Sequence, residues 1–227
     1  RRQEPQPLMT TKIDGPRVAP LSGGPARQLV ILVHGYGSNG DDLIGLVPFW
    51  RPAFPDAAWV SPNAPEPLPG MPGCYQWWDI ANRGDRAAGV RQAAPVLDAF
   101  IDQELEHHGL TEADLVLVGF SQGTMMSLFV APRRERPLAG VIGYSGRLLA
   151  PESLAAEVKS RPPIFLAHGE ADPMVPVTST IEAADVLTRE GFEVMVHTSP
   201  GVGHSIDPPG LQLGGQFLSH VFTPSSA

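Results

Sequence analysis

Cysteine is nearly missing from this sequence, because Cys74 is the single one among 227 residues. One cysteine cannot form an internal disulfide, so nothing in the composition requires an oxidising compartment. We therefore expect a cytoplasmic protein with an ordinary hydrophobic core.

Positive charge is also scarce, with 16 lysines and arginines against 24 aspartates and glutamates and a net charge of -8. This balance argues against nucleic acid or an anionic membrane as a partner. No run of about 18 apolar residues is present, so the sequence predicts no membrane span. The opening RRQEPQPLMT lacks the apolar segment of a signal peptide, but the chain begins at Arg1, and the sequence does not decide whether a leader preceded it.

Short apolar runs alternate with helical patterns along the chain. The runs are rich in valine, isoleucine and leucine at consecutive positions, which is typical of strands buried on both faces of a parallel sheet. We predict strands at residues 29–34, 57–62, 114–120, 138–145, 163–168 and 192–197, and helices near residues 86–107, 122–131, 178–190 and 208–221. This alternation predicts an α/β fold with a mostly parallel central sheet and helices on both faces.

The length fits a single domain over residues 1–227, with residues 1–8 and 223–227 expected to be flexible ends. An Asp14-Gly15 turn within TTKIDGPRVAP also predicts an N-terminal hairpin. The Pro/Gly-rich segment at residues 61–73 is the one long irregular stretch, and such loops in compact domains are usually functional or mobile.

The stretch GYGSNG at residues 35–40 is a complete G-x-G-x-x-G behind a predicted strand, which is where a dinucleotide fingerprint lies. A dinucleotide site would need a ribose-binding acid at the end of the next strand, and AAWVSP ends without one. Asp41 and Asp42 would also repel a pyrophosphate. A nicotinamide-dependent oxidoreductase is therefore an alternative that these residues disfavour.

The stretch GFSQG at residues 119–123 is a G-x-S-x-G between a predicted strand and a predicted helix, the context that a nucleophile elbow requires. The two glycines permit a tight, strained turn, and the helix N-terminus directs partial positive charge at a developing anion. Ser121 is therefore the candidate nucleophile.

A serine nucleophile needs a general base and a carboxylate that orients the base. In the fold that the elbow indicates, the acid follows the serine in the chain and the histidine follows the acid. Glu170 and Asp172 both follow the predicted strand at 163–168, at the sheet edge where ligands gather. His204 lies in a glycine-rich loop before the last predicted helix and is the best candidate for the base.

The other six histidines suit structural roles better, since they end strands, cap a helix or lie inside an element: His34, His107, His108, His168, His197 and His220. No H-E-x-x-H motif and no Cys/His cluster is present, so the sequence predicts no metal site.

These motifs together resemble a family of small serine esterases that includes bacterial carboxylesterases, lysophospholipase-type enzymes and acyl-protein thioesterases, with the α/β-hydrolase fold. The resemblance rests on LVHGYGSNGDDL, GFSQG, YSG at residues 144–146, AHGEADPMVP and GVGHSI. It implies Ser121 as the nucleophile, Asp172 as the orienting acid and His204 as the base and then the acid. It also implies an oxyanion hole formed by the backbone N–H groups of Tyr36 and Gln122, and it implies no cofactor.

The resemblance implies cleavage of carboxylic esters, and by extension thioesters, through an acyl-enzyme intermediate. Short to medium acyl chains are expected, because the sequence offers a short loop and no large helical lid to bound the pocket. The substrate is expected to be a small-molecule ester, and a homodimer is considered because relatives often pair. A catalytically inactive member of the fold that serves as a binding module is the alternative of a different class.

Substrate contacts are expected from the loop after the strand at 57–62 and from the loop that carries the acid. Relatives use the first region as a pocket wall, and both loops follow strand ends at the edge that holds Ser121. Adjacent tryptophans in an extended stretch face opposite ways, so only one need face the substrate. The candidates are Met71, Trp77, Trp78, Met174 and Val175.

Two residues depart from the family pattern. Thr124 stands where relatives commonly have a further glycine, which is expected to alter the packing of the helix near Ser121. Tyr36 stands where many relatives have leucine and places a larger ring beside the scissile group.

Overall fold

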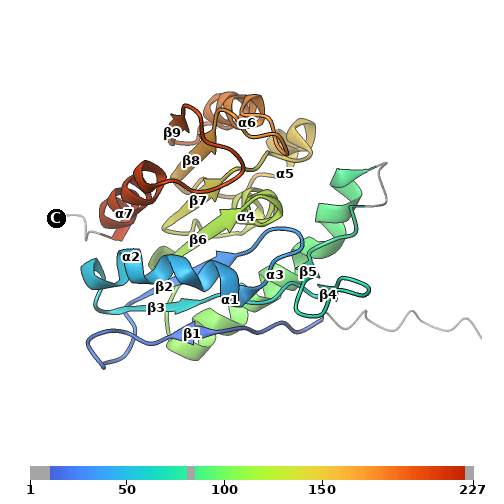
Figure 1. The fold of residues 1–227 in the computed structure, drawn as a ribbon. Helices are drawn as coiled ribbons and strands as arrows, with labels where there is room; N and C mark the ends of the chain where they lie inside the picture. The colour runs from blue at the N-terminus through green and yellow to red at the C-terminus, as the bar shows by residue number, and fades with distance from the viewer. Residues whose placement is uncertain (1–10, 81–84, 223–227) are drawn as a thin grey trace, which may run out of the picture.

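The computed structural model describes residues 11–80 and 85–222, and the ends predicted to be flexible lie outside these ranges. Its central feature is a seven-stranded sheet in the order β1-β3-β2-β6-β7-β8-β9 (Figure 1). β1 is antiparallel to β3, and the other neighbours in the sheet are parallel. The strands are β1 (Arg17–Val18), β2 (Gln28–Val33), β3 (Ala57–Val60), β6 (Leu115–Phe120), β7 (Gly140–Tyr144), β8 (Ile164–Gly169) and β9 (Val194–Ser199).

Alternate residues of the strands enter two cores, one on each face of the sheet. In β2, Val30 and Leu32 belong to one core, whereas Leu29 and Ile31 belong to the other. Helices α3 (Arg86–His108), α4 (Gln122–Arg133) and α6 (Thr178–Arg189) contribute to the core that contains Ile31. The short helices α1 (Gly40–Leu43) and α2 (Val47–Trp50), with the C-terminal helix α7 (Pro208–Phe222), contribute to the core that contains Val30 (Figure 1). The predicted α/β class, with helices on both faces, is confirmed.

The predicted N-terminal hairpin is wrong for the residues that the structure describes. β1 pairs with β3, where Arg17 lies opposite Val60, and the preceding residues continue along the segment after β3. The N–H of Asn63 donates to the carbonyl of Asp14 at 2.9 Å. A side chain at Gly15 would collide with the carbonyl of Ser61. Gly15 is therefore needed for the close approach of two distant segments, and not for a hairpin turn.

The irregular segment after β3 contains a small second sheet, formed by β4 (Glu66–Pro67) and β5 (Tyr75–Gln76). The backbone of Tyr75 forms two hydrogen bonds with the loop after β2. Its N–H donates to the carbonyl of Ser38, and its carbonyl accepts from the N–H of Gly37. This small sheet therefore fixes the chain that leads to Trp77 and Trp78 against the loop that carries Tyr36. The four-residue helix α5 (Leu154–Glu157) lies between β7 and β8.

The carboxyl ends of β2, β6, β7 and β8 meet at one edge of the sheet because these strands are parallel neighbours. Within the described residues, none of the helices has the length and apolar character needed to cross a membrane.

Candidate active site

Ser121 lies in the sharp turn between β6 and α4, with φ of 55° and ψ of -114°, a strained conformation for a residue with a side chain. Its N–H donates to the carbonyl of Tyr144 in the neighbouring strand at 2.9 Å. Glycines make the turn possible, because a side chain at Gly119 would come within 2.6 Å of the backbone of α4 and one at Gly123 would collide with the carbonyl of Val33. The turn therefore has the form that the G-x-S-x-G motif predicts.

The variant Gly123→Ala should destabilise this turn, because its methyl group would need the space of a β2 carbonyl. Overpacking of this kind costs about 1–3 kcal/mol, and each kcal/mol lowers the melting temperature by about 2–4 °C in a domain of this size. Calorimetry measures the shift. Gly203→Ala is the matched control, because a side chain there meets no atom within 4 Å. Equal melting temperatures for the two variants would contradict this account of the elbow.

A chain of hydrogen bonds joins Ser121 to side chains from two loops at the same edge of the sheet. His204, between β9 and α7, has its Nε2 at 3.1 Å from Ser121 Oγ. Its Nδ1 lies 2.6 Å from Oδ2 of Asp172, which follows β8. An ionised carboxylate only accepts hydrogen bonds, so Nδ1 carries the proton and Nε2 accepts from the serine hydroxyl. This arrangement can remove a proton from Ser121.

Asp172 is held as an anion at the end of this chain. Its side chain is 0% exposed, and its Oδ1 accepts from the backbone N–H groups of Met174 at 2.8 Å and Val175 at 2.9 Å. Burial raises the pKa of Asp172, but the N–H of Val175, the ring of His204 and the N–H of Met174 lower it, and the pKa ends below its ordinary value. The carboxylate therefore stays ionised at neutral pH and accepts the hydrogen bond from Nδ1–H of His204.

Glu170, the other carboxylate that the chain order allowed, lies in a different environment. It is exposed to solvent, and its Oε1 accepts a hydrogen bond from the hydroxyl of Thr198 at 2.9 Å. No hydrogen bond joins Glu170 to His204 among the described residues. The geometry therefore favours Asp172, in agreement with the family resemblance.

Two buried histidines make structural hydrogen bonds, as the sequence analysis expected. His168 Nε2 lies 3.3 Å from Asp172 Oδ2, but its Nε2–H donates to the carbonyl of Val175 at 2.8 Å. His34 Nε2 accepts from the backbone N–H of Ala64 at 2.9 Å and so joins the loop after β2 to the segment after β3. Burial lowers the pKa of His34, which keeps the ring neutral.

Tyr36 and Gln122 line the cavity that contains Ser121, and each carries a backbone N–H group. Gln122 is the first residue of α4, where N–H groups have no partner within the helix. Neither N–H donates a hydrogen bond to another described residue. The N-terminus of α4 adds partial positive charge at the same place. These groups suit the stabilisation of an oxygen anion formed beside Ser121.

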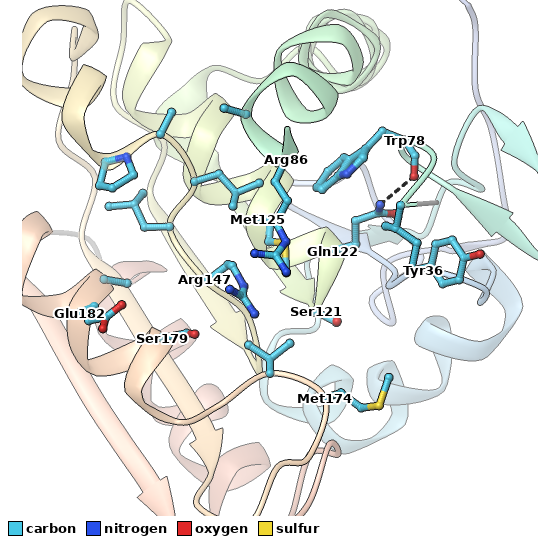
Figure 2. Close-up of a pocket in the computed structure, with 18 of the residues that line it drawn as sticks. Tyr36, Trp78, Arg86, Ser121, Gln122, Met125, Arg147, Met174, Ser179 and Glu182 are labelled. Atoms are coloured by element: carbon cyan, nitrogen blue, oxygen red, sulfur yellow. Dashed lines mark hydrogen bonds between the residues drawn. The ribbon is translucent and has the colours of Figure 1, made fainter. Parts of the chain in front are cut away.

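The side chain of Gln122 ties this turn to a wall of the cavity. Its Oε1 accepts from the backbone N–H of Trp77 at 2.8 Å, and its Nε2 donates to the carbonyl of Trp78 at 3.0 Å (Figure 2). The amide is buried, so both hydrogen bonds form away from competing water.

A cavity of about 900 Å³ opens beside Ser121 (Figure 2). Three predicted contact residues, Trp78, Met174 and Val175, line this cavity. The other two, Met71 and Trp77, do not. Met71 is 53% exposed on the segment between β4 and β5, and the Trp77 ring is buried in the domain, where its Nε1–H donates to the carbonyl of His34 at 2.9 Å.

Most residues of the cavity wall were not predicted from the sequence. Helices α3, α4 and α6 and the segment after β7 contribute to it, and residues from them include Arg86, Met125, Arg147, Leu148, Ala183 and Val186. Arg147 lies just beyond the carboxyl end of a parallel strand, so the rule that ligands gather there is the signal that could have found it. The helical residues depend on how each helix is rotated, which the sequence does not specify.

Thr124, which departs from the family pattern, is accommodated by the turn after β7. Its hydroxyl donates to the carbonyl of Tyr144 at 2.8 Å. Its side chain occupies space beside Gly143 and Gly146, where added side chains would come within 2.8 and 2.5 Å of it. The threonine therefore joins the elbow helix to the strand next to it.

Comparison with known proteins identifies the family of this chain. Residues 17–222 match the model of the phospholipase/carboxylesterase family. Acyl-protein thioesterase 1 of Gibberella zeae is 32% identical over 235 residues, which cover 92% of this chain and 98% of the relative. Esterase YpfH of Escherichia coli is 30% identical over 199 residues, or 87% of this chain and 83% of the relative. The crystal structure of esterase PE8 has a TM-score of 0.89 at 44% identity and covers 93% of this chain and 100% of its own. The chain therefore belongs to the phospholipase/carboxylesterase family and is an ester hydrolase of the α/β-hydrolase fold.

Proposed function

We propose that this hydrolase acts through Ser121, which takes the acyl group of a carboxylic ester and then passes it to water. The observation that carries the proposal is the hydrogen-bonded chain from Ser121 Oγ through His204 to the buried carboxylate of Asp172. Ser121 attacks the carbonyl carbon while His204 Nε2 takes its proton, and Asp172 stabilises the imidazolium that forms.

The oxygen of the attacked carbonyl becomes an anion, and in this proposal it accepts hydrogen bonds from the backbone N–H groups of Tyr36 and Gln122. The C–O bond to the alcohol then breaks, and His204 gives its proton to the leaving oxygen. A water molecule follows the same path: His204 removes its proton while the water oxygen attacks the acyl carbon. The bond between that carbon and Ser121 Oγ then breaks, His204 gives the proton to Oγ, and the carboxylic acid leaves. A thioester would react by the same steps with a thiol as the leaving group.

Fluorophosphonate labelling tests the nucleophile directly. The probe should label the wild-type protein at Ser121 and should not label Ser121→Ala. Ser179→Ala is the matched control, because Ser179 is another serine that lines the cavity. Absence of labelling in the folded wild-type protein would instead favour an inactive binding module, and loss of labelling in Ser179→Ala alone would assign the nucleophile to Ser179.

We propose a small-molecule ester with a short to medium acyl chain as the substrate. Apolar side chains from several elements line the cavity, and its volume limits the chain that it can hold. Each methylene of the acyl chain that is buried in the cavity makes the binding free energy more favourable by about 0.8 kcal/mol. We therefore expect kcat/KM to rise with acyl length until the cavity is full and then to stop rising.

The variant Trp78→Ala should move this optimum toward longer acyl chains. The Trp78 ring is 5% exposed and lies against Gly89 of α3, so its loss enlarges the cavity from that side. The measurement is kcat/KM over p-nitrophenyl esters from acetate to dodecanoate, with labelling of Ser121 as evidence of an intact site. Met71→Ala, outside the cavity, should keep the wild-type profile. An unchanged profile in Trp78→Ala would remove this residue from the acyl pocket.

The homodimer and the cytoplasmic location stay predictions. Sedimentation velocity of the full chain tests the dimer.

A further inference from the structure

Two arginines face the interior of the cavity beside Ser121. Arg147 follows β7, and Arg86 begins α3, and both side chains extend toward the centre of the cavity (Figure 2). An acyl pocket for neutral chains has no use for guanidinium groups, and the partial removal of Arg147 from water carries a cost. The proposed ester chemistry leaves them without a role.

Arg147 has no hydrogen-bond or ion-pair partner among the described residues, although it is half-buried. Its Nε is enclosed by the protein and makes no hydrogen bond. Arg133, also held within the structure, instead pairs with Glu157 at 3.0 Å. Buried guanidinium donors are usually satisfied, so the free state of Arg147 points to a partner that the chain itself does not supply.

The positive charge of Arg147 is poorly compensated by the charged groups around it. Burial and the positive charge of Arg86 lower the pKa of Arg147, and Glu182 on α6 raises it by a smaller effect. Within the described part of the chain, Glu182 forms no ion pair with either arginine. Asp85 also lines the cavity, but its carboxylate caps α3 by accepting from the N–H of Ala88 at 3.1 Å. An anion bound between the arginines would offset both the cost of burying the charge of Arg147 and its repulsion by Arg86.

The chain places Arg147 firmly beside the elbow. Ser145 has φ of 53°, and its N–H donates to the carbonyl of Ala167 at 2.9 Å. The next residue, Gly146, packs so closely on α4 that an added side chain would lie 2.5 Å from Thr124 and 3.1 Å from the carbonyl of Ser121. The backbone that carries Arg147 is therefore fixed relative to Ser121, as a specificity contact requires.

We propose that Arg147, with Arg86 beside it, binds an oxyacid anion on the substrate, so that the preferred esters carry a carboxylate or a phosphate near the scissile bond. The guanidinium group presents its donors in a planar fork that matches either anion. This inference rests on the proposed function of Ser121 and defines a substrate class for it. The anion belongs either to the acyl part, as in a half-ester of a dicarboxylic acid, or to the alcohol part.

Paired esters of equal shape test the proposal. Monomethyl adipate and its neutral analogue methyl 6-methylheptanoate carry the charge difference in the acyl part, and 3-acetoxypropanoate and 3-methylbutyl acetate carry it in the alcohol part. In at least one pair, the wild-type enzyme should prefer the charged ester, and Arg147→Met should lower kcat/KM for that ester by about tenfold or more. The neutral ester should react as before or faster.

Other variants distinguish the effect of the planar guanidinium group from the effect of its positive charge. Arg147→Lys keeps the charge without the planar fork and should retain part of the preference. Arg86→Met should have a smaller effect, because Arg86 is exposed. Arg27→Met removes the same charge from an exposed position at the opposite edge of the sheet, just before β2, and should change neither ester of a pair. Equal losses on charged and neutral esters, or no preference in either pair, would overturn the proposal.

A binding measurement keeps this test independent of turnover. Adipate and inorganic phosphate are titrated calorimetrically into Ser121→Ala and into the same chain with Arg147→Met added. Binding of either anion that depends on Arg147 supports the site and tells carboxylate from phosphate, and binding of neither opposes it. If neutral esters are hydrolysed without Ser121, the proposed mechanism fails while the anion site is still tested. If hydrolysis depends on Ser121 but neither preference nor binding depends on Arg147, only the anion site fails.

Discussion

Replacing Ser121 with alanine should lower kcat for ester hydrolysis by about 10⁴-fold or more, and replacing His204 with alanine should cost a similar factor. The two side chains are joined by the 3.1 Å contact between Nε2 and Oγ. Without the hydroxyl the acyl group has no acceptor, and without the imidazole the hydroxyl keeps its proton. The double variant should lose little more than either single variant, because the two residues act as a unit.

Single-turnover and steady-state kinetics on p-nitrophenyl acetate measure these losses, and melting curves show that the variants are folded. A folded Ser121→Ala enzyme that keeps a tenth of the wild-type kcat would contradict the assignment of Ser121 as the nucleophile. Additive losses in the double variant would show that the two side chains act separately.

The second large effect is expected from Asp172→Asn, which should lower kcat by about 10⁴-fold. Oδ1 of Asp172 accepts two backbone hydrogen bonds, so the asparagine oxygen must take that position and its NH₂ group must face His204. The NH₂ group would donate to Nδ1 and move the imidazole proton to Nε2. The ring then has no acceptor for the proton of Ser121. The loss should fall on kcat, while Ser121→Ala and the double variant Ser121→Ala/Asp172→Asn should show equal residual rates.

Glu170→Gln is the matched control, since it makes the same change in an exposed carboxylate two residues away, whose one hydrogen bond among the described residues is to the hydroxyl of Thr198. Its kcat should remain close to the wild-type value. A large loss in Glu170→Gln with a small loss in Asp172→Asn would show that the orienting carboxylate has been misassigned.

Local patterns predicted the central sheet and the placement of the Ser121 turn. Continuous apolar runs are sufficient for buried parallel strands, and glycines on both sides of a serine specify a turn between strand and helix. The error at the N-terminus has a different origin: β1 pairs with a strand about 40 residues away, from Arg17 to Val60, and a local turn signal contains no information on such a partner.

The cavity wall was predicted only in part for a similar reason. The alternation of side chains in an extended segment predicted that one of two adjacent tryptophans faces away, and Trp77 does so. The charged part of the wall, by contrast, joins the start of α3 to the segment after β7, which lie far apart in the sequence. Only the fold brings Arg86 and Arg147 into one space.

Among the residues that the structure describes, the side-chain amide of Gln122 forms its hydrogen bonds with main-chain atoms of the cavity wall, the N–H of residue 77 and the carbonyl of residue 78. Every amino acid except proline supplies that N–H, and every amino acid supplies that carbonyl. These two hydrogen bonds therefore do not depend on the side chain at residue 78, which lines the cavity. An engineer can accordingly vary Trp78 across many residue types to change acyl selectivity, while the loop keeps its anchor to the helix that follows the nucleophile.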